Sequence, residues 1–239
     1  MTQQEIARRL EEVRSRMQRA MDAAGRKPGQ VLLCAASKTQ SPETVALAAG
    51  LDIDLFGENR VQELVDKFDK GAYGGKRADM IGHLQTNKVR QTVGRAGMIQ
   101  SVDSEKLLRC IQAEAARQQL VQPVLLEINI GGEASKTGAA ADLLWPMLEA
   151  AEECPNLLVQ GLMTVPPKAD TEAENRAMFA RMYRLFCQAG ERGYARSRME
   201  VLSMGMSADF EAAILEGATL VRVGTALFGP RPPVHAGTV

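Results

Sequence analysis

Short apolar runs alternate with amphipathic segments along most of the chain. In the first amphipathic segment Ile6, Leu10, Val13 and Met17 recur at helical spacing after Thr2, a residue suited to a helix N-cap. The apolar run that follows is typical of a strand buried on both faces. We expect such strands at residues 31–38, 55–57, 78–84, 98–102, 124–130, 157–163, 199–203 and 220–223. Beyond the first helix, we expect helices at residues 41–50, 60–70, 88–95, 104–118, 140–153, 171–189 and 210–216.

Strands that alternate with helices over a chain of 239 residues predict a single (β/α)8 TIM barrel of the α/β class. A doubly wound open sheet is the alternative, but the glycine fingerprint G-x-G-x-x-G does not follow the first strand. We therefore assign residues 1–231 to one domain and residues 232–239 to a flexible C-terminal tail.

Composition narrows the classes of partner. The chain has 29 Lys and Arg residues against 29 Asp and Glu residues, and this balance argues against a nucleic-acid or membrane-surface binder. The four cysteines are widely spaced and form no C-x-x-C pair, so we expect neither a metal site nor a disulfide framework. The N-terminus is polar and no apolar run reaches membrane-spanning length. We expect a cytoplasmic protein, and a monomer because no exposed apolar helix stripe stands out.

The residues that follow the strands would meet at one rim of a barrel, where the active sites of this fold lie. Lys38 ends the first strand, where a lysine is either solvated or held in a partly dry site in which it can form a Schiff base. Small residues after the last two strands are typical of loops that bind phosphate, or of ordinary tight turns. These residues are Ser203, Gly205, Ser207, Gly224 and Thr225. A phosphorylated aldehyde such as pyridoxal 5′-phosphate would satisfy both ends of such a site.

Arg222 lies between Val221 and Val223, so its side chain should point into the barrel. In that position it could face the pyridine nitrogen of the cofactor, which an arginine would leave neutral because its guanidinium does not give up a proton. Alternatively, Arg222 could pair with a carboxylate such as Glu58 or Asp209.

Several motifs together resemble those of one known family. They are ASKT at residues 36–39, FGEN at 56–59 with VQE at 61–63, IG at 81–82, LQTNK at 84–88, GLM at 161–163, SMGMSAD at 203–209 and VRVGTALFG at 221–229. With this set the chain resembles the pyridoxal phosphate homeostasis proteins (the YggS/PROSC family) from about residue 5 to residue 231.

The resemblance implies one barrel related to the N-terminal domain of alanine racemase, the type III fold of pyridoxal phosphate proteins, without the racemase's second, β-rich domain. It implies that Lys38 is the Schiff-base lysine and that Arg222 lies near the pyridine nitrogen. It also implies that the phosphate ligands are Ser203, Gly224 and Thr225. Asn59 and Met206 would line the cofactor site. The family is thought to bind and buffer the cofactor, with effects on amino-acid and vitamin B6 balance and no established reaction, so we assign no catalytic residue.

The chain departs from the family pattern at residues 78–83. The sequence there is Ala-Asp-Met-Ile-Gly-His, where the family usually has Trp-His-Phe-Ile-Gly-Pro. His83 is therefore either a substitute at the rim or a surface histidine. Lys88 and Lys136 are rim lysines that could accept the cofactor at a second site or simply face solvent.

Three functions fit these features. The leading one is a carrier that holds pyridoxal phosphate on Lys38 and releases it to client enzymes. The second is a pyridoxal phosphate enzyme such as a weak amino-acid racemase, or one whose partner domain is supplied in trans. Such racemases commonly use a lysine and a tyrosine as bases on opposite faces of the substrate, and we place none of Tyr73, Tyr183 and Tyr194 on the rim. The third is a lysine Schiff-base aldolase without a cofactor, which the family resemblance disfavours.

Overall fold

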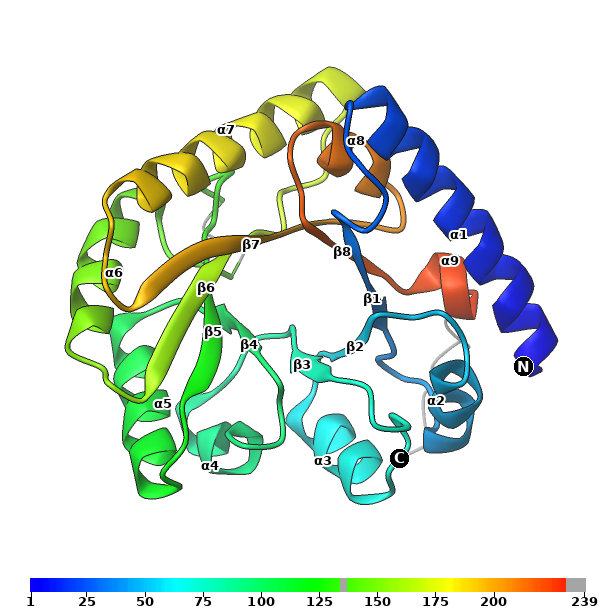
Figure 1. The fold of residues 1–239 in the computed structure, drawn as a ribbon. Coiled ribbons are helices and arrows are strands. Elements are labelled where there is room, and N and C mark those ends of the chain that lie inside the picture. The colour runs from blue at the N-terminus through cyan, green and yellow to red at the C-terminus, as the bar shows by residue number, and fades with distance from the viewer. Residues whose placement is uncertain (134–136, 231–239) are drawn as a thin grey trace, which may run out of the picture.

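The expected strands close into one parallel barrel (Figure 1), which confirms the predicted fold and excludes the open sheet. The structure is a computed structural model that describes residues 1–133 and 137–230, so Lys136 and the predicted tail at residues 232–239 lie outside the described residues. Strand β1 pairs with β2 on one side and with β8 on the other, which closes the ring. The strands are β1 (Leu32–Ala36), β2 (Leu55–Glu58), β3 (Ala78–Met80), β4 (Ile99–Val102), β5 (Gln122–Glu127), β6 (Leu157–Met163), β7 (Ser197–Met206) and β8 (Leu220–Val223).

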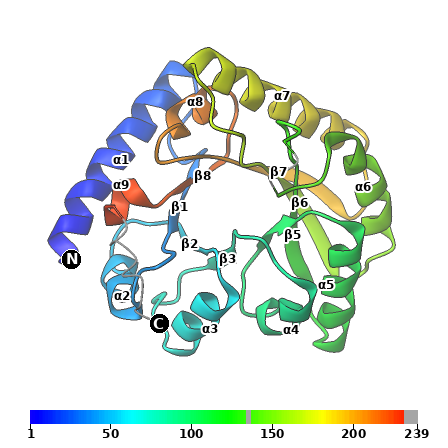
Figure 2. The ribbon, with the colours of Figure 1, turned by 180° about the vertical axis from the view of Figure 1, so that it is seen from behind.

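Helices surround the barrel on its outer side, as the views from front and back show (Figures 1 and 2). They are α1 (Gln3–Ala23), α2 (Pro42–Ala49), α3 (Val61–Asp69), α4 (Val89–Thr92), α5 (Glu105–Arg117), α6 (Leu144–Glu152), α7 (Glu172–Glu191), α8 (Phe210–Leu215) and α9 (Thr225–Phe228), with short 3-10 turns η1 (Thr86–Lys88) and η2 (Ala141–Leu143). Sequence signals explain where several of them begin. Thr2 forms a capping box with Glu5, and Ser41 caps α2 ahead of Pro42. No helix in the described ranges is both long and apolar enough to cross a membrane.

Side chains of the strands alternate between two environments. On β8, Val221 and Val223 belong to the large apolar core that packs against the helices, whereas Leu220 and Arg222 point into the barrel. This alternation confirms the predicted direction of Arg222. The barrel interior is therefore apolar in part, through residues such as Cys34 and Leu220, and polar in part.

Element boundaries differ from the predicted ones mainly at the rim. Strand β3 ends at Met80 rather than at residue 84. Beyond it, Gly82 passes so close to the end of β2 that a Cβ atom at this position would lie 2.4 Å from the carbonyl oxygen of Asn59. Strand β7 is longer than expected and continues to Met206, and the unexpected helix α9 begins directly after β8.

Strand β6 contains a glycine at a position where the barrel leaves no room for a side chain. Gly161 has φ of +147°, and a Cβ atom there would lie 1.9 Å from the carbonyl oxygen of Val201 on β7. We expect Gly161→Ala to lower the free energy of unfolding by about 2–4 kcal/mol, because the added methyl group must push two paired strands apart. Urea denaturation measures this change. Gly190→Ala in α7 is the control, since its Cβ would make ordinary contact at 3.4 Å with Met199, and a loss as large there would contradict the interpretation.

Candidate functional site

Four neighbouring strands bring the predicted cofactor residues to one rim of the barrel. Their order around the barrel is β2, β1, β8, β7. Asn59 follows β2 and Lys38 follows β1. Arg222 lies on β8 with Gly224 and Thr225 just after it, and Ser203 and Met206 lie on β7. Cys34 pairs with Arg222 across β1 and β8, and a Cβ atom on Gly224 would lie 3.1 Å from the carbonyl oxygen of Ala36. Because the chain leaves β1 and β8 at this contact, Lys38 and the loop that begins at Gly224 emerge beside each other.

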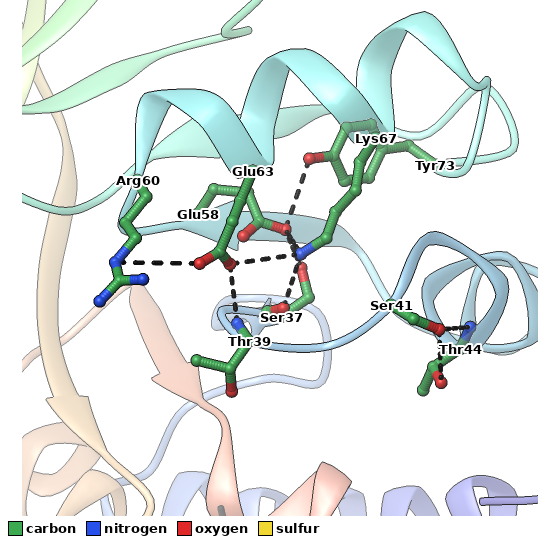
Figure 3. Close-up of polar contacts among 9 residues, drawn as sticks. All are labelled: Ser37, Thr39, Ser41, Thr44, Glu58, Arg60, Glu63, Lys67 and Tyr73. Atoms are coloured by element: carbon green, nitrogen blue, oxygen red, sulfur yellow. Dashed lines mark hydrogen bonds and ion pairs between the residues drawn. The ribbon is translucent and has the colours of Figure 1, made fainter. Parts of the chain in front are cut away.

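Lys38 occupies a turn whose two flanking residues are held in place, and Figure 3 draws these residues, Ser37 and Thr39. Ser37, just before it, is buried and donates its hydroxyl hydrogen to Glu58 Oε1 over 2.5 Å. Thr39, just after it, has φ of +65°, and its backbone N–H donates to Glu63 Oε2 over 2.7 Å. Lys38 itself is half-buried, between these two held residues.

A buried ion pair lies behind this turn. Lys67 Nζ is 2.7 Å from Glu58 Oε1 and also donates to the backbone carbonyl of Ser37 over 2.8 Å. Lys67 is 2% exposed and Glu58 is fully buried. Burial raises the pKa of the Glu58 carboxyl, and the Lys67 charge opposes this shift. The Tyr73 hydroxyl also reaches Glu58 Oε1, at 3.4 Å.

Arg222 spans the barrel interior, where its guanidinium contacts Ser203 and Thr164. Its Nη1 donates to Ser203 Oγ over 2.5 Å, and its Nη2 donates to the backbone carbonyl of Thr164 over 2.8 Å. Among the described residues no carboxylate lies within ion-pair distance of it. Glu58 pairs with Lys67, and Asp209 accepts a hydrogen bond from the Met206 backbone, so the alternative of a carboxylate partner is wrong. Burial lowers the pKa of the Arg222 guanidinium.

A line of hydrogen bonds continues from Arg222 across the barrel. Ser203 Oγ donates to Gln100 Oε1, and Gln100 Nε2 donates to Asp79 Oδ2, each over 2.7 Å. Asp79 is fully buried and forms an ion pair with Arg77 at 3.0 Å. Burial raises the pKa of Asp79 to about 6, against the opposing effects of Arg77 and Gln100. The unusual segment at residues 78–83 thus places a titratable group inside the barrel.

The geometry distinguishes two serines near the expected phosphate site. Ser203 is fully buried, with its hydroxyl engaged by Arg222 and Gln100. Ser207 lies at the rim, where its Oγ accepts hydrogen bonds from the backbone N–H groups of Gly224 at 3.2 Å and Ala226 at 3.3 Å. Both backbone donors therefore converge on the Ser207 hydroxyl oxygen, and backbone N–H groups and hydroxyls are groups that bind phosphate oxygens. The structure therefore favours Ser207 over Ser203 as the phosphate-contacting serine.

Asn59 and Met206, which are predicted to line the site, differ in their surroundings. Asn59 Oδ1 is buried and has no hydrogen-bond partner among the described residues, which is unusual for a polar atom unless a ligand completes its bonding. Met206 is 36% exposed and lines a groove of about 620 Å³ together with Val165 and Asp209, but none of the other predicted cofactor residues lines that groove. A ligand with an anionic group near Gly224 and a carbonyl near Lys38 suits these groups.

The opposite side of the rim carries acidic residues. The exposed His83 places Nδ1 3.2 Å from Asp103 Oδ2, and the buried Glu127 accepts a hydrogen bond from the Thr137 hydroxyl over 2.6 Å. Burial raises the pKa of Glu127. Lys88 is half-buried in η1. No group of three or more His, Cys, Asp or Glu side chains within residues 1–133 and 137–230 could hold a metal ion.

Sequence reasoning missed several residues of these networks, although some carried a signal. Lys67 lies three residues after Leu64 and six after Val61, on the apolar face of α3, where a lysine is exceptional. Gln100 interrupts the apolar run of β4 and is completely buried. Tyr73 gave no signal, because only the folded loop after α3 brings its hydroxyl to Glu58.

Related sequences agree with this architecture. Residues 9–232 match the family described as alanine racemase, N-terminal domain. A pyridoxal phosphate homeostasis protein of Aquifex aeolicus is 41% identical over 223 residues, which are 93% of this chain and 97% of that protein. The protein of the same name from Pseudomonas aeruginosa is 38% identical, with 95% of this chain and 96% of that protein covered. The chain belongs to the pyridoxal phosphate homeostasis protein family.

Solved structures of other proteins share this barrel fold. PipY of Synechococcus elongatus, in a structure with PLP bound, is 31% identical and has a TM-score of 0.81, with 94% of this chain and 100% of that chain covered. Alanine racemase of Clostridium difficile has a TM-score of 0.71 at 13% identity, and the match spans 92% of this chain but 60% of the racemase. The likeness to the racemase is one of fold alone.

The buried ion pair predicts a large difference between single and double variants. Lys67→Met leaves the Glu58 carboxylate buried without its counter-charge, so we expect the free energy of unfolding to fall by about 3–5 kcal/mol. Glu58→Gln/Lys67→Met removes both charges and should recover most of that loss. Urea denaturation at pH 7 separates the variants, with Lys70→Met, at an exposed pair with Asp66, as a control expected to change little. A double variant as unstable as the single one would show that the charge imbalance is not the cause.

Asp79 predicts a pH dependence of stability. Its pKa rises from an ordinary value of 3.8 to about 6 on folding, so the folded state holds this proton more tightly. The resulting stabilisation is complete below about pH 4 and is lost as the pH rises through about 6. Between pH 4 and pH 7 we expect the wild type to lose about 2 kcal/mol of unfolding free energy relative to Asp79→Asn. Urea denaturation across this range tests the sign, and parallel pH profiles for the two proteins would contradict it.

Proposed function

We propose that this protein binds pyridoxal 5′-phosphate and serves the homeostasis of that cofactor. The observation that carries the proposal is the set of groups at the rim, seen in a chain that is 31% identical to PipY, for which a structure with PLP bound exists. Together they are the complement of a phosphorylated aldehyde: backbone donors at Gly224 and Ala226, a lysine in the turn after β1, and an Asn59 oxygen that has no partner among the described residues. Bound pyridoxal phosphate supplies an aldehyde that a lysine amine can capture reversibly.

The residues around Lys38, Arg222 and the start of α9 then have distinct roles. Lys38 forms the Schiff base, and Ser207, Gly224 and Thr225 hold the phosphate at the start of α9. Arg222 faces the pyridine nitrogen; its guanidinium has further N–H donors beyond those used by Ser203 and Thr164. An arginine in this position leaves the ring nitrogen neutral, which makes the ring a weak electron sink and favours storage over catalysis.

The carrier role extends this binding function. We place the protein in the cytoplasm as a monomer that releases the cofactor to client enzymes. The positions of the tyrosines support a carrier over a racemase. Tyr73 is buried with its hydroxyl directed at Glu58, and Tyr183 and Tyr194 lie in and just after α7.

Covalent capture is the direct test of Lys38. Purified protein mixed with pyridoxal phosphate should turn yellow, and borohydride should fix one cofactor to Lys38, as peptide mass spectrometry would show. Lys38→Ala should abolish the adduct, whereas the control Lys88→Ala should retain it. A wild-type protein that takes up no cofactor would overturn the proposal. Sustained inversion of a single-enantiomer amino acid by the loaded protein would replace the carrier role with a racemase activity.

The phosphate end has its own test. Ser207→Ala and Thr225→Ala should each weaken cofactor retention by about tenfold, the value of one hydrogen bond to a charged group. Equilibrium dialysis with pyridoxamine 5′-phosphate, which lacks the aldehyde, measures this loss without the covalent bond. Thr86→Ala, at an exposed position in η1, should bind as wild type does. Unchanged affinity in both rim variants would show that the phosphate lies elsewhere.

A further inference from the structure

Helix α3 holds the backbone on both sides of Lys38 (Figure 3). On the N-terminal side, Lys67 Nζ donates to the carbonyl oxygen of Ser37 over 2.8 Å. On the C-terminal side, Glu63 Oε2 accepts the Thr39 N–H over 2.7 Å. Lys67 and Glu63 are one helical turn apart, and their charged groups approach to 3.7 Å. One helix face therefore contacts the residue before and the residue after the lysine.

The conformation of the turn needs such support. Thr39 has φ of +65°, a left-handed conformation that a β-branched residue adopts at a cost in free energy. Surrounding contacts must hold a residue in this state, and the contact found at Thr39 is the hydrogen bond from its backbone N–H to Glu63. Without that acceptor, the backbone after Lys38 would relax toward a commoner conformation and carry the lysine with it.

The burial of Lys67 also indicates that this face of α3 supports the Lys38 turn. The side chain is 2% exposed on the apolar face of α3, where a leucine or methionine would pack without the cost of a buried charge. Its hydrogen bonds go to the Ser37 carbonyl and to Glu58, and Glu58 in turn accepts the Ser37 hydroxyl hydrogen. The buried pair therefore holds the segment that carries Lys38 through two atoms of Ser37, its carbonyl oxygen and its hydroxyl oxygen.

We propose that Glu63 and the Glu58–Lys67 pair are positioning residues, which preset the direction of the Lys38 amine for attack on the cofactor's aldehyde. This inference rests on the proposed function. Their effect is on the bond-forming step, in which the amine adds to the carbonyl carbon and water leaves, and not on the binding of phosphate or ring. Small displacements of a reacting group slow such a step steeply, whereas non-covalent affinity depends on other residues of the rim.

Glu63 offers the sharper test because its side chain is 21% exposed and its replacement threatens the fold least. Glu63→Ala should slow formation of the yellow adduct by about tenfold or more in stopped-flow absorbance. Its affinity for pyridoxamine 5′-phosphate should stay within about twofold of the wild type. Glu63→Gln keeps an oxygen that can accept the Thr39 N–H and should restore the rate. Asp66→Ala, at an exposed position of the same helix, is the matched control and should capture at the wild-type rate.

The buried pair is tested with Glu58→Gln/Lys67→Met, which removes both charges together and with them the donor to Ser37. This variant should also capture slowly while it binds pyridoxamine 5′-phosphate normally, and a thermal melt verifies that it is folded. Wild-type capture rates in both Glu63→Ala and the double variant would overturn the inference, as would an equal loss of capture and of non-covalent affinity. A wild-type protein that forms no adduct would instead reject the proposed function itself.

Discussion

The pairing of β1 with β8 is the constraint on which the site depends. It closes the barrel, aligns Cys34 with Arg222 and sets Gly224 against Ala36. Residues separated by nearly the whole length of the chain, Lys38 and Thr225, thereby emerge at the same rim. Parallel pairing also fixes the direction of both strands, so that Lys38 and the loop that begins at Gly224 both follow the C-terminal ends of their strands. A shift of register would separate them.

Two buried polar systems flank this closure, and they differ in kind. One links Ser37, Glu58 and Lys67 behind the Lys38 turn, and it fixes backbone. The other crosses the barrel from Arg222 to Asp79 through neutral side chains, and it fixes a guanidinium. Buried charges of this sort add little to net stability, because desolvation offsets their attraction. Because burying these charges costs free energy, their position beside the rim is better explained by the atoms that they hold in place than by a gain in stability.

Much of the fold could be predicted from the sequence because strands buried on both faces are unbroken apolar runs, and alternation of such runs with helices admits few topologies. Lys38 and Arg222 could be placed because one closely follows a buried strand and the other alternates with apolar residues along a strand. The choice between Ser203 and Ser207 could not, since β7 runs on to Met206 and shifts register against β8 between Ser203 and Met206. Contacts such as Lys67 with Ser37 depend on how a helix lies against the barrel, which no local pattern records.

The hydroxyl of Ser207 has a consequence for how firmly an anion would be held. It already satisfies the N–H groups of Gly224 and Ala226 within the protein itself. A phosphate oxygen that takes over these N–H groups would free the hydroxyl to donate to the phosphate, so the free energy gained is the difference between two hydrogen-bonded states. Departure of the anion, conversely, leaves no orphaned donors, because the hydroxyl returns to them. Because the loop satisfies these N–H groups itself when no anion is bound, release of an anion costs less free energy and a bound anion can be exchanged.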